Sequence, residues 1–213
     1  AALSRKVWLK SGAYLVIDQT EALVSIDVNT GKNVGKASLR KTIAETNCEA
    51  AVEIARQLRL RDLSGIIIID FIDMEEKEDK ETVLATLREA LRGDRMRSVI
   101  LGMTELGFVE LTRKKLRANL ADTLQTTCPY CKGSGKVLNA ETVALKIRSA
   151  LIARVSEGAG AQQRFTVAAS PTVAALLREH SREELRQAFP GVTLEIVSDE
   201  SMHLEHFSIR TQA

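Results

Sequence analysis

Residues 14–29 decide the fold of the first half of the chain, and they read YLVIDQTEALVSIDVN. Two runs rich in β-branched and apolar residues, 14–18 and 22–28, flank a short polar stretch. This pattern predicts two strands joined in a β-hairpin. Asp18 stands where the first run meets the polar stretch, so we interpret it as a residue of the hairpin turn.

After this hairpin the sequence predicts a loop, a helix and a third strand. Residues 29–35 are rich in turn residues, and residues 39–63 carry an apolar stripe at helical spacing. Gly65 ends that stretch, and the near-continuous apolar run 66–71 favours a strand that is covered on both faces. The helical stripe consists of Ile43, Cys48, Ala51, Ile54, Ala55 and Leu58.

The following segments continue to alternate between helix and strand patterns. A helix is expected after the charged residues 75–80, because apolar residues recur there at helical spacing. Strands are expected at 98–101 and 108–111, and a basic helix at 112–124. The resulting order, β-β-α-β-α-β-β-α, is typical of a mixed α/β sheet.

The stretch 128–135, CPYCKGSG, interrupts this alternation and predicts a compact knuckle at a domain boundary. Beyond it we expect a second, smaller α/β unit that begins with a helix at 142–155. Ser170 and Pro171 are placed as the N-cap and first residue of a later helix. That unit is further expected to contain a strand at 165–168, helical residues Leu176, Leu177, Leu185 and Phe189, and closing strands at 192–197 and 204–209.

Composition places the chain among ordinary globular proteins. Of 213 residues, 45% are hydrophobic and 27% are charged, which argues against a disordered chain. No apolar run approaches the roughly 20 residues of a membrane helix, and basic residues interrupt any signal peptide at the start. Three cysteines do not make a disulfide framework, so we expect a cytoplasmic protein. Because the chain begins with Ala1, we expect it to be a fragment.

Two aspartates at strand ends are the first candidates for chemistry. Asp27 and Asp70 each follow an apolar run, and sites in open sheets form beyond the carboxyl ends of strands. Two carboxylates held there would repel each other, and a hard cation such as Mg²⁺ would relieve that repulsion. Asn29, on the same side of an extended chain, could position a ligand water or a phosphate oxygen. Aspartates at strand ends also cap turns, which leaves a purely structural reading open. Asp73 is interpreted as a helix cap rather than a further ligand.

Cys128 and Cys131 form a Cys-x-x-Cys pair, which supplies half of a tetrahedral zinc site. His203 and His206 could provide the other two ligands, although they lie far along the chain. Alternatively, two copies of the chain could each contribute the cysteine pair, which would make the metal a dimerisation device. A redox dithiol is a third reading, but such a pair normally opens a helix, and the neighbouring glycines argue against a helix here.

The sequence offers little support for other catalytic classes. All three histidines are C-terminal, so a nucleophile with a base in reach is not apparent. The net charge of +2 does not by itself indicate a nucleic-acid partner. Two basic clusters are more informative, although charge alone favours solvated helix faces. They consist of Arg56, Arg59 and Arg61, and of Arg113, Lys114, Lys115 and Arg117.

Several long segments resemble the ribonuclease E/G family, and they occur in the family's order. They include the hairpin residues 16–29, the helical stretches 46–51 and 53–63, and the strand region 66–74. Residues 111–115 and the cysteine stretch 128–135 also match. The resemblance covers nearly the whole chain, although residues after about 140 match in layout more than in residues.

This resemblance implies a fold and an organisation. Residues 1–127 would form a deoxyribonuclease-I-like catalytic subdomain with a mixed sheet, and residues 128–138 a zinc link. Residues 139–213 would form a small α/β domain used in oligomerisation. The zinc, one per dimer, would join two chains through Cys128 and Cys131, and the small domain would pair dimers into a homotetramer.

The resemblance also implies an activity. The family cleaves single-stranded RNA, prefers AU-rich sites, and leaves 5′-phosphate and 3′-hydroxyl ends during rRNA and tRNA processing and mRNA decay. Asp27 and Asp70 would hold Mg²⁺, Asn29 would assist them, and the two basic clusters would contact RNA. The family's N-terminal half, which holds the RNA through an oligonucleotide-binding barrel, is not visible in this sequence. We therefore expect this chain alone to bind RNA weakly and to cut it slowly or not at all.

Two other functions remain open from the sequence. The chain could be a non-catalytic, zinc-linked module for oligomerisation and RNA binding. A chaperone-type zinc module is a weaker alternative, because that class repeats the cysteine motif several times and this chain contains it once.

Overall fold

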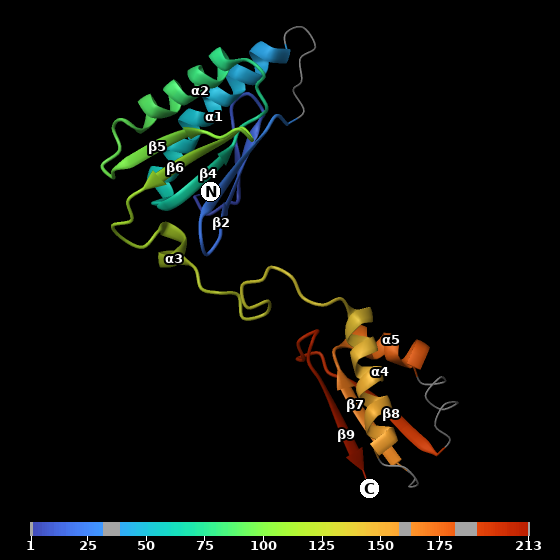
Figure 1. Ribbon diagram of the computed structural model, residues 1–213. Coiled ribbons are helices and arrows are strands. Elements are labelled where there is room, and N and C mark those ends of the chain that lie inside the picture. Colours follow the sequence, from blue (N-terminus) through green and yellow to red (C-terminus); the bar gives the residue numbers. More distant parts are fainter. Residues whose placement is uncertain (1, 32–38, 158–162, 182–190, 213) are drawn as a thin grey trace. The chain divides into compact units, whose positions relative to one another are not determined.

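The computed structural model describes residues 2–31, 39–157, 163–181 and 191–212 (Figure 1). They form two compact units, Ala1–Thr126 and Thr127–Ala213. The Cys-x-x-Cys stretch therefore groups with the second unit. The expected loop residues 32–35 and the expected helical residues Leu185 and Phe189 lie outside the described residues.

The described part of the first unit contains a six-stranded sheet in the order β1-β2-β3-β4-β6-β5. The predicted hairpin is confirmed, since β2 and β3 pair antiparallel. The next pair, β3 and β4, is parallel, with α1 between them in the sequence. The sheet is therefore mixed, as predicted. Its elements are β1 (Lys6–Trp8), β2 (Tyr14–Gln19), β3 (Val24–Asn29), α1 (Leu39–Arg61), β4 (Gly65–Asp70), α2 (Lys77–Leu91), β5 (Ser98–Met103) and β6 (Phe108–Arg113).

The helices α1 and α2 lie side by side over one face of this sheet (Figure 1). The predicted stripe of α1 is confirmed, because Ile54, Ala55 and Leu58 are fully buried. In β4, Ile67 and Ile69 are fully buried beneath the helices, whereas Ile66 on the opposite face is 53% exposed. The prediction that β4 is covered on both faces is therefore wrong for the described residues, because β-branched runs also occur in strands with a single buried face.

The predicted basic helix at 112–124 is also wrong. The strand β6 continues to Arg113, and only the short helix α3 (Leu120–Leu124) follows. The strand continues because Arg113 pairs with Gly65 on one side and with Ser98 on the other. The charged run therefore belongs to a strand end and an irregular segment rather than to a helix face.

Arg113 is an internal structural residue rather than part of an exposed basic cluster. Its side chain is 2% exposed and donates to the carboxylate of Asp94 at 2.7 Å and to that of Asp62 at 3.2 Å. It also donates to the carbonyl of Leu63 at 2.8 Å. Burial opposes ionisation of both carboxylates, but the arginine bonds outweigh it and lower the pKa of Asp62 and of Asp94. Arg113 thereby ties β6 to the end of α1.

The second unit is a small α/β domain, as predicted. Its sheet has the order β8-β7-β9, with β7 and β8 parallel and β7 and β9 antiparallel. Phe165, Ile147 and Leu151 are buried in its core. Pro171 begins α5 as expected, although the side chain of Ser170 makes no capping bond. The elements are α4 (Ala140–Glu157), β7 (Gln163–Ala169), α5 (Pro171–Leu176), the π-helical turn η1 (Leu177–Ser181), β8 (Val192–Ser198) and β9 (Phe207–Gln212).

Replacing Arg113 with leucine should destabilise the first unit by about 3–5 kcal/mol, because it leaves the buried carboxylate of Asp94 without its cation. Urea denaturation measures this loss. Since the pKa values of Asp62 and Asp94 are lowered on folding, their contribution is present above about pH 4 and is lost as the pH falls through the lowered values.

The difference between wild type and Arg113→Leu should therefore shrink in acid. Lys114→Leu, at the exposed neighbouring position, is the matched control and should change stability by less than about 0.5 kcal/mol. A loss for Arg113→Leu no larger than that of the control would contradict the structural role of Arg113.

Candidate active site and cysteine loop

The parallel pairing of β3 and β4 brings the two predicted strand-end aspartates together. Asp27 and Asp70 are register partners; Asp70 is the last residue of β4, and Asp27 lies two residues before the end of β3. Directly opposed residues in neighbouring strands have their Cβ atoms about 5 Å apart. Both side chains are exposed, on the sheet face opposite the helices. The arrangement therefore presents two carboxylates side by side to solvent.

Asn29 belongs to the same group of side chains. It lies two residues after Asp27 in β3, so both side chains leave the strand on the same face. Its side-chain amide donates a hydrogen bond to Oδ2 of Asp27 at 2.6 Å. Asn29 therefore orients one carboxylate of the pair, and the structure brings together all three residues predicted to carry chemistry.

The carboxylate pair is electrostatically unfavourable without a cation. Burial and the nearby charges of Asp27 and Asp73 raise the pKa of Asp70 above its ordinary value. Asp73 is exposed. The prediction that it caps the following helix is wrong, because Glu76 occupies the N-cap position of α2. Asp73 instead contributes negative charge near Asp70. The paired carboxylates of Asp27 and Asp70 offer the oxygen donors that a hard cation prefers, and the charge of Asp73 adds to the negative potential around them.

Asn47 holds the segment that follows Asp70, and the sequence analysis did not single it out. It is fully buried on α1. Its side chain donates to the carbonyl of Ile72 at 2.8 Å and accepts from the amide of Ile72 at 3.1 Å. Asn47 therefore fixes the backbone between Asp70 and Asp73. A buried amide within a helical apolar stripe was the signal available in the sequence.

The first predicted basic cluster does not form one cationic surface. Arg61 is buried and donates to the side chain of Gln57 and the carbonyl of Ser4. Arg56 pairs with Glu53 on its own helix at 2.6 Å. Arg59 is exposed and donates to the carbonyl of Ala90. Arg61 therefore stabilises the fold, and Arg56 and Arg59 are the members left near solvent.

The second predicted basic cluster is divided in the same way. Arg113 is buried, as described above, whereas Lys114 and Lys115 are exposed. Arg117 is 75% exposed but is bonded to the carboxylate of Asp62. The cations of this cluster that face solvent are thus Lys114, Lys115 and Arg117.

The two cysteines of the Cys-x-x-Cys stretch lie in a tight loop. Residues 125–139 contain no helix, so this pair does not open one, in agreement with the argument against a redox dithiol. The backbone amides of Gly135 and Gly133 favour the thiolate of Cys131 and lower its pKa. Both glycines have positive φ, of 70° and 89°, which lets the loop fold back toward that sulfur. The loop therefore favours one thiolate beside a second cysteine, the donor chemistry that zinc prefers.

His203 packs against this loop but is not free to bind a metal. Its ring stacks on Tyr130 with centroids 3.8 Å apart. Its Nε2 atom donates to the carbonyl of Tyr130 at 2.6 Å, and its Nδ1 atom accepts from the amide of Glu205 at 3.1 Å. Both nitrogens are occupied, which argues against His203 as a zinc ligand. Among the described residues, no group of three or more His, Cys, Asp or Glu side chains is placed to hold one ion.

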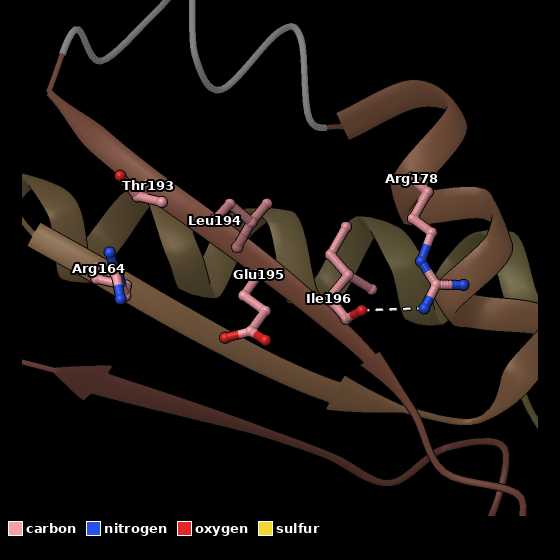
Figure 2. A pocket seen from close by; sticks show the side chains of 6 residues that line it. All are labelled: Arg164, Arg178, Thr193, Leu194, Glu195 and Ile196. Carbon is pink, nitrogen blue, oxygen red and sulfur yellow. Dashed lines mark hydrogen bonds between the residues drawn. The ribbon is translucent and has the colours of Figure 1, made fainter.

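A hollow of about 430 Å³ lies in the second unit beside β8 (Figure 2). Arg164, Glu195 and Arg178 supply its charged side chains, and Arg178 donates to the carbonyl of Ile196 at 3.0 Å. Figure 2 shows Glu195 on β8 and Arg178 on the turn of helix next to it. Among the described residues that line it, Glu195 is the one carboxylate, so this lining does not reproduce the paired carboxylates of the first unit.

Comparison with known proteins agrees with the resemblance seen in the sequence. A model of the "Ribonuclease E/G family" matches residues 1–116, and a model of the "RNase E/G, Thioredoxin-like domain" matches residues 127–212. The first match contains the carboxylate pair, and the second contains the cysteine loop and the small sheet. Both halves of the chain are therefore similar to the ribonuclease E/G class of proteins.

Curated relatives match along almost the whole chain. Ribonuclease G of Escherichia coli (strain K12) is 45% identical over 211 residues, which are 98% of this chain and 42% of the relative. Ribonuclease E of the same strain is 38% identical over 213 residues, covering 98% of this chain and 20% of the relative. Ribonuclease E of Nostoc sp. (strain PCC 7120) is 52% identical over 134 residues, which are 63% of this chain and 20% of the relative. The chain belongs to the ribonuclease E/G family and spans less than half the length of these relatives.

One further finding concerns membranes. Among the described residues, no helix is both long enough and apolar enough to cross a lipid bilayer.

In metal-free buffer at neutral pH, Asp70→Asn should stabilise the first unit by up to about 1 kcal/mol, because it removes a like-charge pair facing across two strands. The pKa of Asp70 is raised on folding, so its penalty is absent below the unfolded value near 3.9 and appears as the pH rises through the raised value. Thermal melts from pH 3 to pH 8 measure this.

The matched control is Glu105→Gln, at an exposed carboxylate in the turn between β5 and β6, which should leave the pH profile unchanged. An Asp70→Asn variant no more stable than wild type at neutral pH would show that the two carboxylates do not repel each other.

Proposed function

We propose that this chain is the catalytic core of a metal-dependent endoribonuclease that cleaves single-stranded RNA. The observation that carries the proposal is the parallel register of Asp27 with Asp70 at an exposed strand end. Family membership and the names of the relatives, ribonuclease G and ribonuclease E, support the same reaction class. The deoxyribonuclease-I-like character of the first unit is part of this proposal.

Asp27 and Asp70 would hold Mg²⁺. They fit this ion because they offer oxygen donors from two paired strands. Burial and the neighbouring charges of Asp27 and Asp73 raise the pKa of Asp70, and a cation between the two carboxylates would offset the like-charge part of this cost. When bound, Mg²⁺ supplies charge neutralisation at the phosphate and a water of increased acidity. Asn29 keeps the Asp27 carboxylate in one orientation through its 2.6 Å hydrogen bond.

RNA is polyanionic and must approach a negatively charged patch, so cations elsewhere on the surface must help to hold it. The available cations lie away from the carboxylates, because β6 ends with Arg113 opposite Gly65, at the far end of β4 from Asp70, and α1 covers the other face of the sheet. Lys114, Lys115, Arg117, Arg56 and Arg59 are the members of the predicted clusters that remain near solvent. We expect these residues to contact RNA phosphates and to contribute to binding regardless of base sequence. Arg61 and Arg113 are withdrawn from that set because both are buried and bonded internally.

The further properties expected from the resemblance belong to the same proposal. They are a preference for AU-rich single strands, 5′-phosphate and 3′-hydroxyl products, and a role in rRNA and tRNA processing and mRNA decay. We expect the protein to act in the cytoplasm, where its three cysteines remain reduced.

The activity is tested most directly in a chimera, in which this chain replaces the matching 211 residues of Escherichia coli ribonuclease G. The unchanged chimera should cleave a labelled single-stranded RNA in Mg²⁺. Asp27→Asn and Asp70→Asn should each lower kcat by at least about 100-fold, because the metal loses a ligand at the reacting phosphate.

Asp122→Asn is the control, since Asp122 is an exposed carboxylate on α3 and should leave kcat unchanged. The unaltered isolated chain provides a second readout, in which millimolar Mg²⁺ should raise the melting temperature and neither aspartate variant should respond. A folded chimera that does not cut RNA, or aspartate variants that cut normally, would refute the catalytic proposal.

We further propose that Cys128 and Cys131 form half of a zinc site completed by the same two residues of a second copy. The adjacent thiols and the stabilised thiolate of Cys131 support this, and the occupied nitrogens of His203 argue against a site within one chain. Such a zinc would hold a homodimer together, and the small domain could then join dimers into a tetramer.

Native mass spectrometry of the zinc-loaded chain tests this proposal. The expected species is a dimer that carries one zinc, and Cys131→Ser should release the metal and yield monomers. The matched control, Cys48→Ser, alters a cysteine that packs against the core and should retain both metal and dimer. One zinc per monomer would contradict the shared site and would point to ligands within one chain.

A further inference from the structure

An exposed tryptophan lies on the outermost strand of the large sheet. Trp8 in β1 is 63% exposed, and its ring meets that of Tyr14 with centroids 5.2 Å apart and an interplanar angle of 58°. An indole ring of this exposure leaves a large apolar surface in water, which is costly unless something else covers it. Aromatic residues make up only 4% of the chain, so two of them in contact at one place on the surface are unusual for this sequence.

The two rings share a sheet face with the carboxylate pair. Trp8 is the register partner of Tyr14, and Tyr14 is the partner of Asn29, which bonds to Asp27. Cross-strand partners project from the same face of a sheet, and Leu15 beside Tyr14 is buried on the other face. The aromatic pair therefore begins one strand away from Asn29, on the surface where the carboxylates lie.

A cation accompanies the rings. The Lys6 ammonium lies 3.4 Å from the ring centroid of Tyr14 and 4.1 Å from that of Trp8. Lys6 is the register partner of Val16, which is itself the partner of Asp27. The backbone positions of Lys6 on β1 and Asp27 on β3 are therefore two strand spacings apart, about 10 Å.

The turn that carries these residues is held firmly. The carboxylate of Glu49 on α1 accepts from the backbone amides of Lys10 and Ser11 at 2.7 and 3.3 Å. Gly31, just after Asn29, has φ of 66°, and a Cβ added there would lie 2.2 Å from the carbonyl oxygen of Gly12. The turn between β1 and β2 and the end of β3 are therefore packed together, which fixes the rings relative to Asn29.

We propose that Trp8 and Tyr14, together with the Lys6 ammonium, form a stacking platform for a base of single-stranded RNA next to the carboxylate pair. This inference rests on the proposed function and names how the substrate is held at that site. Aromatic rings stack on the faces of unpaired bases, and a neighbouring ammonium meets the adjoining phosphate. A purely apolar partner would match the rings but not the ammonium, and continuity with the carboxylates favours the substrate.

The platform is tested with the intrinsic fluorescence of Trp8, which is the single tryptophan of the chain. The Asp27→Asn variant, which should not cut, is titrated with a single-stranded 10-mer RNA at low salt. A second titration uses an abasic 10-mer with the same phosphates. The RNA should quench Trp8 emission, whereas the abasic strand should bind more weakly and leave the emission almost unchanged.

Variants separate stacking from charge. Fluorescence anisotropy of a labelled RNA should show a loss of affinity of about 5- to 150-fold for Trp8→Leu and for Tyr14→Leu, with most affinity retained in Trp8→Phe. Lys6→Gln should reduce the salt dependence of binding by about one phosphate contact. Leu101→Ala, which alters a 65% exposed apolar residue on the opposite edge strand, is the matched control and should bind normally.

The outcomes distinguish this inference from the proposed function. Cleavage that depends on Asp27 and Asp70, without quenching by RNA or without an effect of the ring variants, would overturn the platform and leave the nuclease intact. Quenching by RNA together with carboxylate variants that still cut would support the platform and overturn the catalytic proposal. Trp8 emission that changes with protein concentration and not with RNA would show that a second copy covers the rings, which also overturns the platform.

Discussion

The proposed site of the first unit depends on one constraint: the parallel pairing of β3 with β4 sets Asp27 opposite Asp70. Burial and the charges of Asp27 and Asp73 raise the pKa of Asp70, so the ionised pair is held at a cost in free energy. The arrangement persists because the strands on which they lie are fixed by a buried core beneath, where Ile26, Ile67 and Ile69 are fully buried. A core of this kind holds an unfavourable surface arrangement that a ligand can exploit.

Polar side chains around the carboxylate pair also hold the site in place. Asn29 orients one carboxylate, Asn47 fixes the backbone after the other, and Glu49 holds the turn that carries the aromatic rings. Asn47 and Glu49 lie on α1, on the opposite side of the sheet from the solvent-facing carboxylates. The helix therefore supports the site from behind through polar contacts at its first half, while its second half supplies the apolar core.

Ion pairs in this chain serve the fold more than they serve binding. Arg113 and Arg61 were predicted to contact RNA because they stand in basic runs, yet both are buried and bonded to internal partners. A buried arginine with two carboxylates is costly to disrupt, so its position is determined by stability. The cysteine loop differs from these buried arginines. Its backbone amides stabilise the thiolate of Cys131 near the surface, where another molecule can reach it.

Local patterns in the sequence were sufficient for the hairpin, for α1 and its stripe, for the mixed sheet and for the two strand-end aspartates. These features depend on side-chain periodicity and on turn residues, which are properties of neighbours along the chain. The tertiary structure decided the rest: the single covered face of β4, the strand ending at Arg113 in place of a helix, the burial of Arg61, and the gathering of Trp8 and Tyr14 beside Asn29. Strand register decides the end of β6 and the gathering of the rings, because cross-strand pairing determines which side chains meet. Packing of the helices on one face of the sheet decides the covered face of β4, and contacts with Gln57 and with the carbonyl of Ser4 hold Arg61. These contacts join segments far apart in sequence, which no local pattern encodes.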